Sequence, residues 1–227
     1  MQETYFIMFK KILFAAVLSL SVVSLSAQEN NEKQSALILY AGPQFSMANV
    51  DGGFNPSCKF SYLAGVGYER NNLFNHFGLF GALEFSEKGT KNFLFMDGRT
   101  DSYNLRYLQL NIGLKYQRTF WGIQGFGEVG PYFAYGINGT STVNGHELDE
   151  GSFDDLTVRD GLIYTDGGAG FKRFDIGFKV AIGVEFHNIQ IKAGYQRGFM
   201  NIADDQLISN GYKNHGFFIT AGYAFKL

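Results

Sequence analysis

A period of two residues at the end of the sequence constrains the fold more than any other feature. The segment His215–Leu227 alternates between two faces, one of which carries the row Ile219, Ala221, Tyr223, Phe225 and Leu227. An apolar strand at the edge of a soluble sheet invites aggregation, because its backbone groups lack partners. A closed barrel has no edge, since its last strand pairs with its first. We therefore expect an all-β fold, a closed antiparallel transmembrane β-barrel of the outer-membrane type.

Strand-like segments follow one another along the chain before this last strand. Each is long enough to cross a bilayer, which takes about 9–11 tilted residues. The expected strands are Leu37–Ser46, Lys59–Arg70, His76–Lys88, Tyr103–Arg118, Trp121–Asn138, Lys172–Phe186, Asn188–Asn201 and His215–Leu227. The pattern predicts an up-and-down barrel of about eight strands, with ten as the alternative.

The connectors between these strands alternate in length. The short ones are Asn71–Asn75, Thr119–Phe120 and His187. The long ones, rich in Gly, Asp and Asn, are Met47–Cys58, Gly89–Ser102, Gly139–Phe171 and Ile202–Asn214. Short periplasmic turns and long outer loops are typical of outer-membrane barrels. Both chain ends would then lie on the periplasmic side.

Aromatic residues mark the ends of the clearest wall segment. In Lys172–Phe186 an apolar row begins at Phe174 and ends at Phe186, as expected of two interfacial girdles. The chain holds 24 Phe and 13 Tyr among 227 residues, far more than a soluble core of this size needs. This excess favours a wall that faces lipid.

The polar faces of the strands distinguish a membrane barrel from a soluble one. They consist mostly of Gly, Ala, Gln and Asn, with a few charges of both signs, whereas a soluble exterior is about 25–35% charged. Small barrels fill their interior with compact side chains and compensated charges. We therefore predict a lumen charge network inside a filled barrel that is not a general porin. Its members are Glu84, Lys115, Glu128, Lys179, Glu185 and Lys192.

The first residues read as an export signal. Lys10 and Lys11 precede the apolar run Ile12–Leu25, and small residues follow at Ser26 and Ala27. We expect a signal peptide over residues 1–27, cleaved between Ala27 and Gln28. A polar tether over 28–35 and a barrel domain over 36–227 would follow. The expected location is the outer membrane of a Gram-negative bacterium.

Charge, cysteine content and motifs exclude several functions. A net charge of −2 argues against a nucleic-acid partner, and the single Cys58 cannot form an internal disulfide. We expect no cofactor, no metal and no catalytic residue. The one constellation with catalytic residue types is His215 near Asp204, Asp205 and Ser209, and its spacing matches no known motif.

The longest connector is acidic. Clustered carboxylates could bind Ca²⁺, but these lack the regular spacing of a calcium loop, so a solvated acidic loop is the favoured interpretation. The carboxylates are Glu147, Asp149, Glu150, Asp154, Asp155 and Asp160. Arg197 is expected to face lipid near the outer rim, where its side chain can reach headgroups.

The wall segments carry a resemblance to a known family. The segments are Phe77–Gly89, Tyr107–Tyr116, Phe174–Gly177, Gly194–Gly198 and Asn201–Ile202. They resemble the PorT-like outer-membrane β-barrels of Bacteroidota over nearly the whole mature chain. The resemblance implies fold and compartment, and some PorT-like members take part in protein secretion or gliding.

The last strand is also similar to the signal that the barrel-assembly machinery recognises. Thr220, Gly222 and Phe225 match that signal, whereas Leu227 stands where an aromatic residue is usual. The resemblance therefore implies insertion by the assembly machinery. The expected surroundings are outer-membrane lipid and lipopolysaccharide.

Three functional hypotheses follow from these residues. The favoured one is a non-enzymatic barrel with a structural or interaction role. The second is a component of a secretion or gliding assembly, which would bring secretion-system proteins as partners. The third is a lipid-modifying enzyme of the outer membrane, for which the sequence offers the least support.

Overall fold

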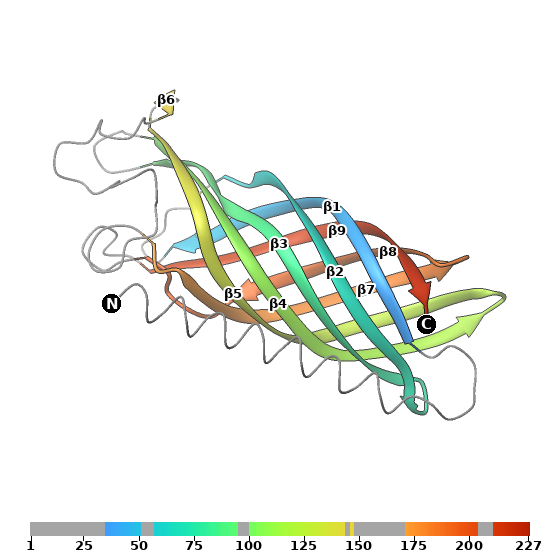
Figure 1. Ribbon diagram of the computed structural model, residues 1–227. Helices are drawn as coiled ribbons and strands as arrows, with labels where there is room; N and C mark the ends of the chain where they lie inside the picture. Colours follow the sequence, from blue (N-terminus) through green and yellow to red (C-terminus); the bar gives the residue numbers. More distant parts are fainter. Residues whose placement is uncertain (1–34, 51–56, 95–99, 144–145, 148–170, 204–210) are drawn as a thin grey trace. The chain divides into compact units, whose positions relative to one another are not determined.

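The computed structural model describes residues 35–50, 57–94, 100–143, 146–147, 171–203 and 211–227 (Figure 1). They form one antiparallel sheet of nine strands, of which β6 has two residues, so eight long strands make the wall. The long strands are β1 (Ser35–Val50), β2 (Lys59–Phe74), β3 (Phe77–Leu94), β4 (Thr100–Phe120), β5 (Ile123–Val143), β7 (Phe174–Phe186), β8 (Ile189–Gly198) and β9 (Tyr212–Lys226). The short β6 (His146–Glu147) pairs with the end of β5.

The sheet closes on itself. Each long strand pairs with the next one along the chain, and β9 returns to β1 with Ala36 opposite Lys226 and Val50 opposite Tyr212. Figure 1 shows the red β9 beside the blue β1. The expected closed antiparallel barrel is therefore confirmed, with eight long strands in the described part of the chain.

Tight turns join the strands at one end of the barrel, which we call the turn end. The turns are Asn75–His76, Trp121–Gly122 and His187–Asn188, and all six of these residues have positive φ. Positive φ at both central residues is the property of type I′ turns, whose twist matches that of the flanking strands. We call the opposite end of the barrel the loop end.

The strands are longer at the loop end than the sequence pattern predicts. The connector expected at Gly89–Ser102 is wrong for most of its length, because β3 continues to Leu94 and β4 begins at Thr100. Likewise β5 continues to Val143 rather than ending at Asn138. Backbone hydrogen bonds between strands form whatever the side chains are. These extensions therefore lack the alternation of apolar and polar residues by which a strand is recognised in the sequence.

Two predicted strands are shorter in the structure. Strand β7 begins at Phe174 instead of Lys172, and β8 ends at Gly198 instead of Asn201. The residues beyond these ends turn into the loop end of the barrel, where Phe171 and Ala203 form an isolated bridge. Apolar residues continue past the observed start of β7 and the observed end of β8, so the sequence pattern predicts longer strands there.

Gly89 lies within β3 in a backbone conformation that other residues rarely adopt. Its φ is +132°, and its N–H donates a hydrogen bond to the Ser46 hydroxyl at 2.9 Å. A Cβ at this position would lie 1.9 Å from the carbonyl oxygen of Tyr103. Only glycine fits this irregularity, which lets β3 continue past it.

The two faces of the wall are opposite in character. Apolar side chains cover the outside: on β7, for example, Phe174, Ile182 and Phe186 are exposed. Polar and charged side chains fill the inside, among them Gln44, Glu84 and Gln109. Among the described residues no helix is long and apolar enough to cross a membrane, a finding that does not bear on crossing by strands.

Candidate functional site: the filled lumen

Strands β3 and β7 place a buried ion pair in the middle of the lumen. The Nζ atom of Lys179 lies 2.9 and 2.7 Å from the two carboxylate oxygens of Glu84. The Tyr40 hydroxyl donates a third hydrogen bond to the same carboxylate, at 2.9 Å. A carboxylate that accepts three hydrogen bonds from an ammonium and a hydroxyl is well compensated for the loss of water.

A second ion pair lies between β5 and β8. Lys192 Nζ is 2.9 Å from Glu128 Oε2 and 4.6 Å from the centre of the Tyr40 ring. Tyr40 therefore contacts both pairs, through its hydroxyl and through its ring face. Four of the six charges predicted for the lumen thus pair with one another.

The other two predicted charges pair with residues that the sequence analysis did not include. Lys115 Nζ lies 2.5 Å from Glu69 Oε2, and its charge is 4.2 Å from the Phe126 ring centre. Glu185 accepts a hydrogen bond from Lys226 near the turn end. Glu69 lies on the same face of β2 as Lys59 and Ser61, so counting by two along that strand would have found it.

A further ion pair lies nearer the loop end, and the sequence analysis predicted neither of its members. Lys88 Nζ is 3.5 Å from Asp175 Oδ2 and 4.1 Å from the centre of the Tyr132 ring. The same carboxylate oxygen accepts hydrogen bonds from the Tyr132 hydroxyl at 3.0 Å and from Asn214 Nδ2 at 3.2 Å. Both charges are almost fully buried. Lys88 lies on the same face of β3 as Glu84, and Asp175 lies on the same face of β7 as Lys179. Counting by two along these strands would therefore have found both residues.

Glutamine side chains connect these centres across the lumen. Near the turn end, Gln190 Nε2 donates to Glu185 at 2.8 Å and to Glu69 at 3.4 Å. In the middle, Gln109 donates to Gln196 at 3.2 Å, and Gln196 donates to Gln44 at 3.0 Å. The lumen therefore holds linked hydrogen bonds instead of an open channel.

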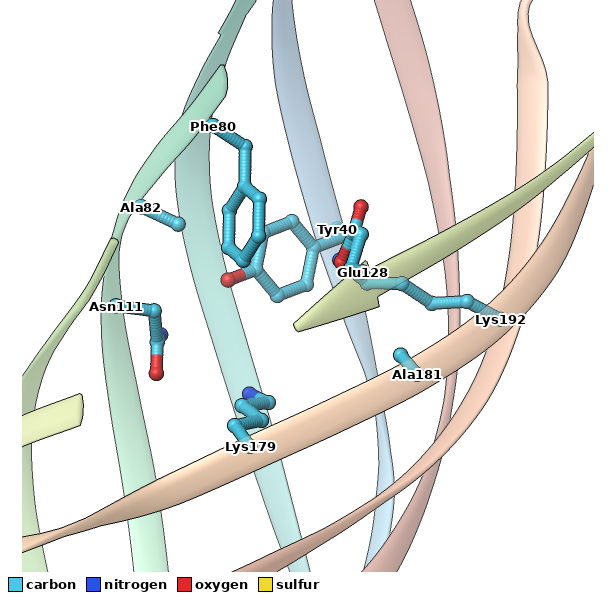
Figure 2. Close-up of a pocket in the computed structure, with 8 residues that line it drawn as sticks. All are labelled: Tyr40, Phe80, Ala82, Asn111, Glu128, Lys179, Ala181 and Lys192. Atoms are coloured by element: carbon cyan, nitrogen blue, oxygen red, sulfur yellow. The ribbon is translucent and has the colours of Figure 1, made fainter. Parts of the chain in front are cut away.

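A small cavity lies beside the two central ion pairs (Figure 2). Its volume is about 10 Å³, close to the smallest space that accommodates one water molecule. Figure 2 shows its lining, which consists of Tyr40, Phe80, Ala82, Asn111, Glu128, Lys179, Ala181 and Lys192. A cavity of this size cannot hold an organic substrate, which needs about 300 Å³ or more.

An apolar cluster closes the lumen at the loop end. Phe171, Ile202 and Ala203 come from segments outside the long strands, and Tyr212 begins β9. The rings of Phe171 and Tyr212 lie 4.9 Å apart, edge to face. Backbone hydrogen bonds from Lys172 N to Ile202 O and from Ile202 N to Tyr212 O hold these segments in place. The cap therefore closes the loop end of the lumen. At the turn end an open pocket of about 380 Å³ is lined by Asn72, His76, Gln117, Arg118, Thr119 and Gln124.

Comparison with known families decides what kind of barrel this is. The model of the outer membrane protein beta-barrel domain matches residues 15–225, nearly the whole chain. The chain belongs to the outer membrane protein β-barrel domain family. No curated protein matches it.

Solved structures of other outer-membrane barrels are similar to this member of the family at low sequence identity. For Ail, the attachment invasion locus protein of Yersinia pestis, the TM-score is 0.43 and the identity 15%, covering 85% of this chain and 99% of Ail. For Neisserial surface protein A the TM-score is 0.46 and the identity 11%, and the match covers 87% of this chain and 100% of that protein. For the N-terminal barrel domain of Pseudomonas aeruginosa OprF the TM-score is 0.36 and the identity 10%, and the match covers 84% of this chain and 98% of that domain.

The remaining predicted residues of this outer membrane β-barrel lie in several places. His215 is half-buried on the outer face, whereas Asp204, Asp205 and Ser209 lie outside the described residues. Of the acidic connector only Glu147 is described, as part of β6. Asp149, Glu150, Asp154, Asp155 and Asp160 are not described, and neither are Ala27 and Gln28. The described residues contain no group of three or more His, Cys, Asp or Glu side chains able to hold a metal ion.

The residues of the predicted assembly signal point to both sides of β9. Thr220 is buried in the lumen, and Gly222 lies opposite Tyr40 of β1. Phe225 and Leu227 are exposed on the outer face. A Cβ on Gly222 would lie 2.7 Å from the Leu39 carbonyl oxygen, so this glycine allows the closing strands to approach each other.

Proposed function

We propose that the protein is a resident barrel of the bacterial outer membrane that acts through its outer surfaces and not through its lumen. Its role is structural or interactive, and it is neither a general porin nor an enzyme. The observation that carries this proposal is the filled interior. Buried ion pairs, linked glutamines and an apolar cap leave a cavity of about 10 Å³ beside the central charges.

The distribution of side chains supports the membrane location. Apolar residues line the outside and charged residues the inside, which is the reverse of a soluble barrel. The exposed Phe74, Phe120 and Trp121 lie at or beside the tight turns, where an aromatic girdle is expected. Membership in the outer membrane family agrees with this location.

Ion conductance in planar bilayers tests the closed lumen. The full chain is expected to give no stable channel, because ions would have to displace the buried pairs. A Glu84→Ala/Lys179→Ala variant, which removes both members of a central pair and so leaves no unpaired charge, is the comparison in which leakage is expected. A large, stable conductance of the unaltered protein would contradict the proposal.

Export and assembly are the second part of the proposal. The signal over residues 1–27, cleaved between Ala27 and Gln28, would deliver a mature chain with a tether over 28–35. The barrel-assembly machinery would then recognise Thr220, Gly222, Phe225 and Leu227 on the closing strand. N-terminal sequencing of the membrane-extracted protein checks this, and a mature start before Gln28 would argue against the cleavage site.

A PorT-like role in secretion or gliding is a separate possibility that stands on the sequence resemblance alone. Extraction in mild detergent followed by pull-down distinguishes it from a free-standing barrel. Stable co-purification of secretion proteins would support the secretion role. Lipid A and phospholipid profiles of a deletion strain are expected to be unchanged, and an altered profile would show that the protein modifies lipid.

A further inference from the structure

Three basic side chains gather on the outer face of the barrel. Arg197 of β8 and His215 of β9 are Cα partners across the two strands, and Lys213 lies two residues farther along the same face of β9. Arg197 is exposed, and the other two are half-buried. All three lie toward the loop end. We call Arg197, His215 and Lys213 the basic cluster.

Aromatic residues surround this cluster. Phe178 is the Cα partner of Arg197 on β7, and Tyr195 precedes it on its own strand face. The Tyr195 ring centre lies 6.4 Å from that of His215 and 4.9 Å from that of Phe217. The cluster therefore belongs to the apolar outer wall and not to a solvated loop.

Among the residues that the structure describes, no carboxylate balances the cluster on this part of the wall. The outward rows of β1, β7, β8 and β9 contain no Asp or Glu in the part of the chain that the structure describes. Within the same residues, Arg197 forms no ion pair. On a wall that faces lipid, an exposed guanidinium without a counter-charge lies beside an apolar medium. An anion from the surroundings would stabilise it, since an unpaired charge in such a medium is costly.

The height of the cluster places it at the outer boundary of the membrane. The apolar band of such barrels is about 25 Å tall, and strands with their usual rise and tilt climb about 2.5 Å per residue. If Phe186 marks the inner edge, Phe178 and its partner Arg197 lie about 20 Å above it. The remaining distance of about 5 Å is within the reach of an arginine side chain.

We propose that the basic cluster binds the phosphate group of a lipid in the outer leaflet. This inference rests on the proposed membrane location. Arginine matches phosphate with paired N–H donors. Beside it, lysine adds a charge and histidine adds a ring N–H donor. The aromatic neighbours supply a flat apolar surface for the acyl chains below the headgroup. The site gives His215 a role in binding lipid instead of catalysis.

Lipid binding to the detergent-extracted full chain, followed by native mass spectrometry, tests the proposal. The probe is lipid A carrying both phosphates, compared with dephosphorylated lipid A. We expect the Arg197→Gln/His215→Gln/Lys213→Gln variant to bind the phosphorylated probe about tenfold or more weakly, because it loses charge-assisted hydrogen bonds. Lys91→Gln, which removes an exposed charge from the loop end of β3, is the matched control and should bind normally.

Several results would overturn the proposal. Equal binding by the triple variant, or equal binding of dephosphorylated lipid A, would show that the cluster does not select lipid phosphate. Retention of inorganic phosphate without lipid A would identify a free-anion site instead. Vesicle flotation of both proteins separates this failure from that of the proposed function: if neither floats, the membrane location itself is wrong.

Discussion

Single residues in the lumen carry charges that are stable only with their partners. Glu84 accepts from Lys179 and Tyr40, and both charged side chains are buried. Removing one member of such a pair leaves the other uncompensated, whereas replacing both by apolar groups is often tolerated.

Glu84→Gln is therefore expected to lower the free energy of unfolding by about 3–5 kcal/mol. Denaturant unfolding in lipid vesicles measures it. The double variant Glu84→Gln/Lys179→Met should recover much of this loss, because no unpaired ammonium remains. An exposed control, Arg118→Gln, should change stability by less than about 0.5 kcal/mol. Equal stability of Glu84→Gln and the unaltered protein would contradict the buried pair.

Gly89→Ala is expected to destabilise the barrel by about 1–3 kcal/mol, because the backbone holds a positive φ that alanine rarely adopts. The added methyl would also meet the Tyr103 carbonyl oxygen at 1.9 Å. Gly81→Ala on the same strand is the control, since the nearest atom there lies 4.0 Å away. If both variants unfold alike, the irregularity at Gly89 is not required.

The lumen residues illustrate how far single positions can be predicted. Alternation alone identified Glu84 and Lys179 as inward-facing, because inward and outward faces follow from counting by two. It did not reveal that Lys115 pairs with Glu69, because the pairing depends on how β2 and β4 are staggered around the barrel. The Lys88–Asp175 centre was missed although both residues share faces with predicted members.

At the scale of elements, the tight turns determine where the membrane boundary lies. The turn between β4 and β5 holds Trp121, the single tryptophan of the chain, with a fully exposed side chain. Tryptophan favours the membrane–water interface. The turn end should therefore lie at one headgroup region.

Tryptophan fluorescence of the protein in vesicles tests this position. Nitroxide-labelled lipids carrying the label near the headgroup should quench Trp121 more strongly than lipids labelled near the end of the acyl chain. The reason is that the turn lies at the boundary while the strands cross the interior. Stronger quenching by the deep label would place the turn inside the bilayer and contradict the assigned boundary.

Strand ends were predicted more closely at the turn end than at the loop end. The exception is β2, which continues to Phe74 beyond the expected Arg70, so the connector expected at Asn71–Asn75 is mostly strand. Two-residue turns separate rows of clear alternation, so the start of β5 was placed within two residues, at Trp121 against the observed Ile123. At the other end β4 reaches Thr100 through residues that are polar on both faces. The sequence of one strand does not predict how far it extends in this region, because the extension depends on hydrogen bonds to the neighbouring strands.

At the scale of the whole molecule, the sequence predicted that the barrel closes on itself, but it did not predict the apolar cap at the loop end. An apolar last strand needs a partner, and β1 supplies it from Ala36 to Val50. The apolar cap combines Phe171 from the connector before β7, Ile202 from the connector after β8, and Tyr212 at the start of β9. Their contact depends on tertiary packing, which local periodicity does not encode.

The filled lumen is the central claim, and thiol accessibility in intact vesicles tests it most directly. In a Cys58→Ser background, single cysteines replace Ser86 and Thr220, whose side chains are buried inside the barrel, and Thr119, which is exposed near a turn. A charged, water-soluble thiol reagent should modify Thr119→Cys rapidly and leave Ser86→Cys and Thr220→Cys unmodified until the protein is unfolded. Modification of the two lumen positions as fast as the exposed one, in the folded protein, would show a water-filled channel and contradict the account.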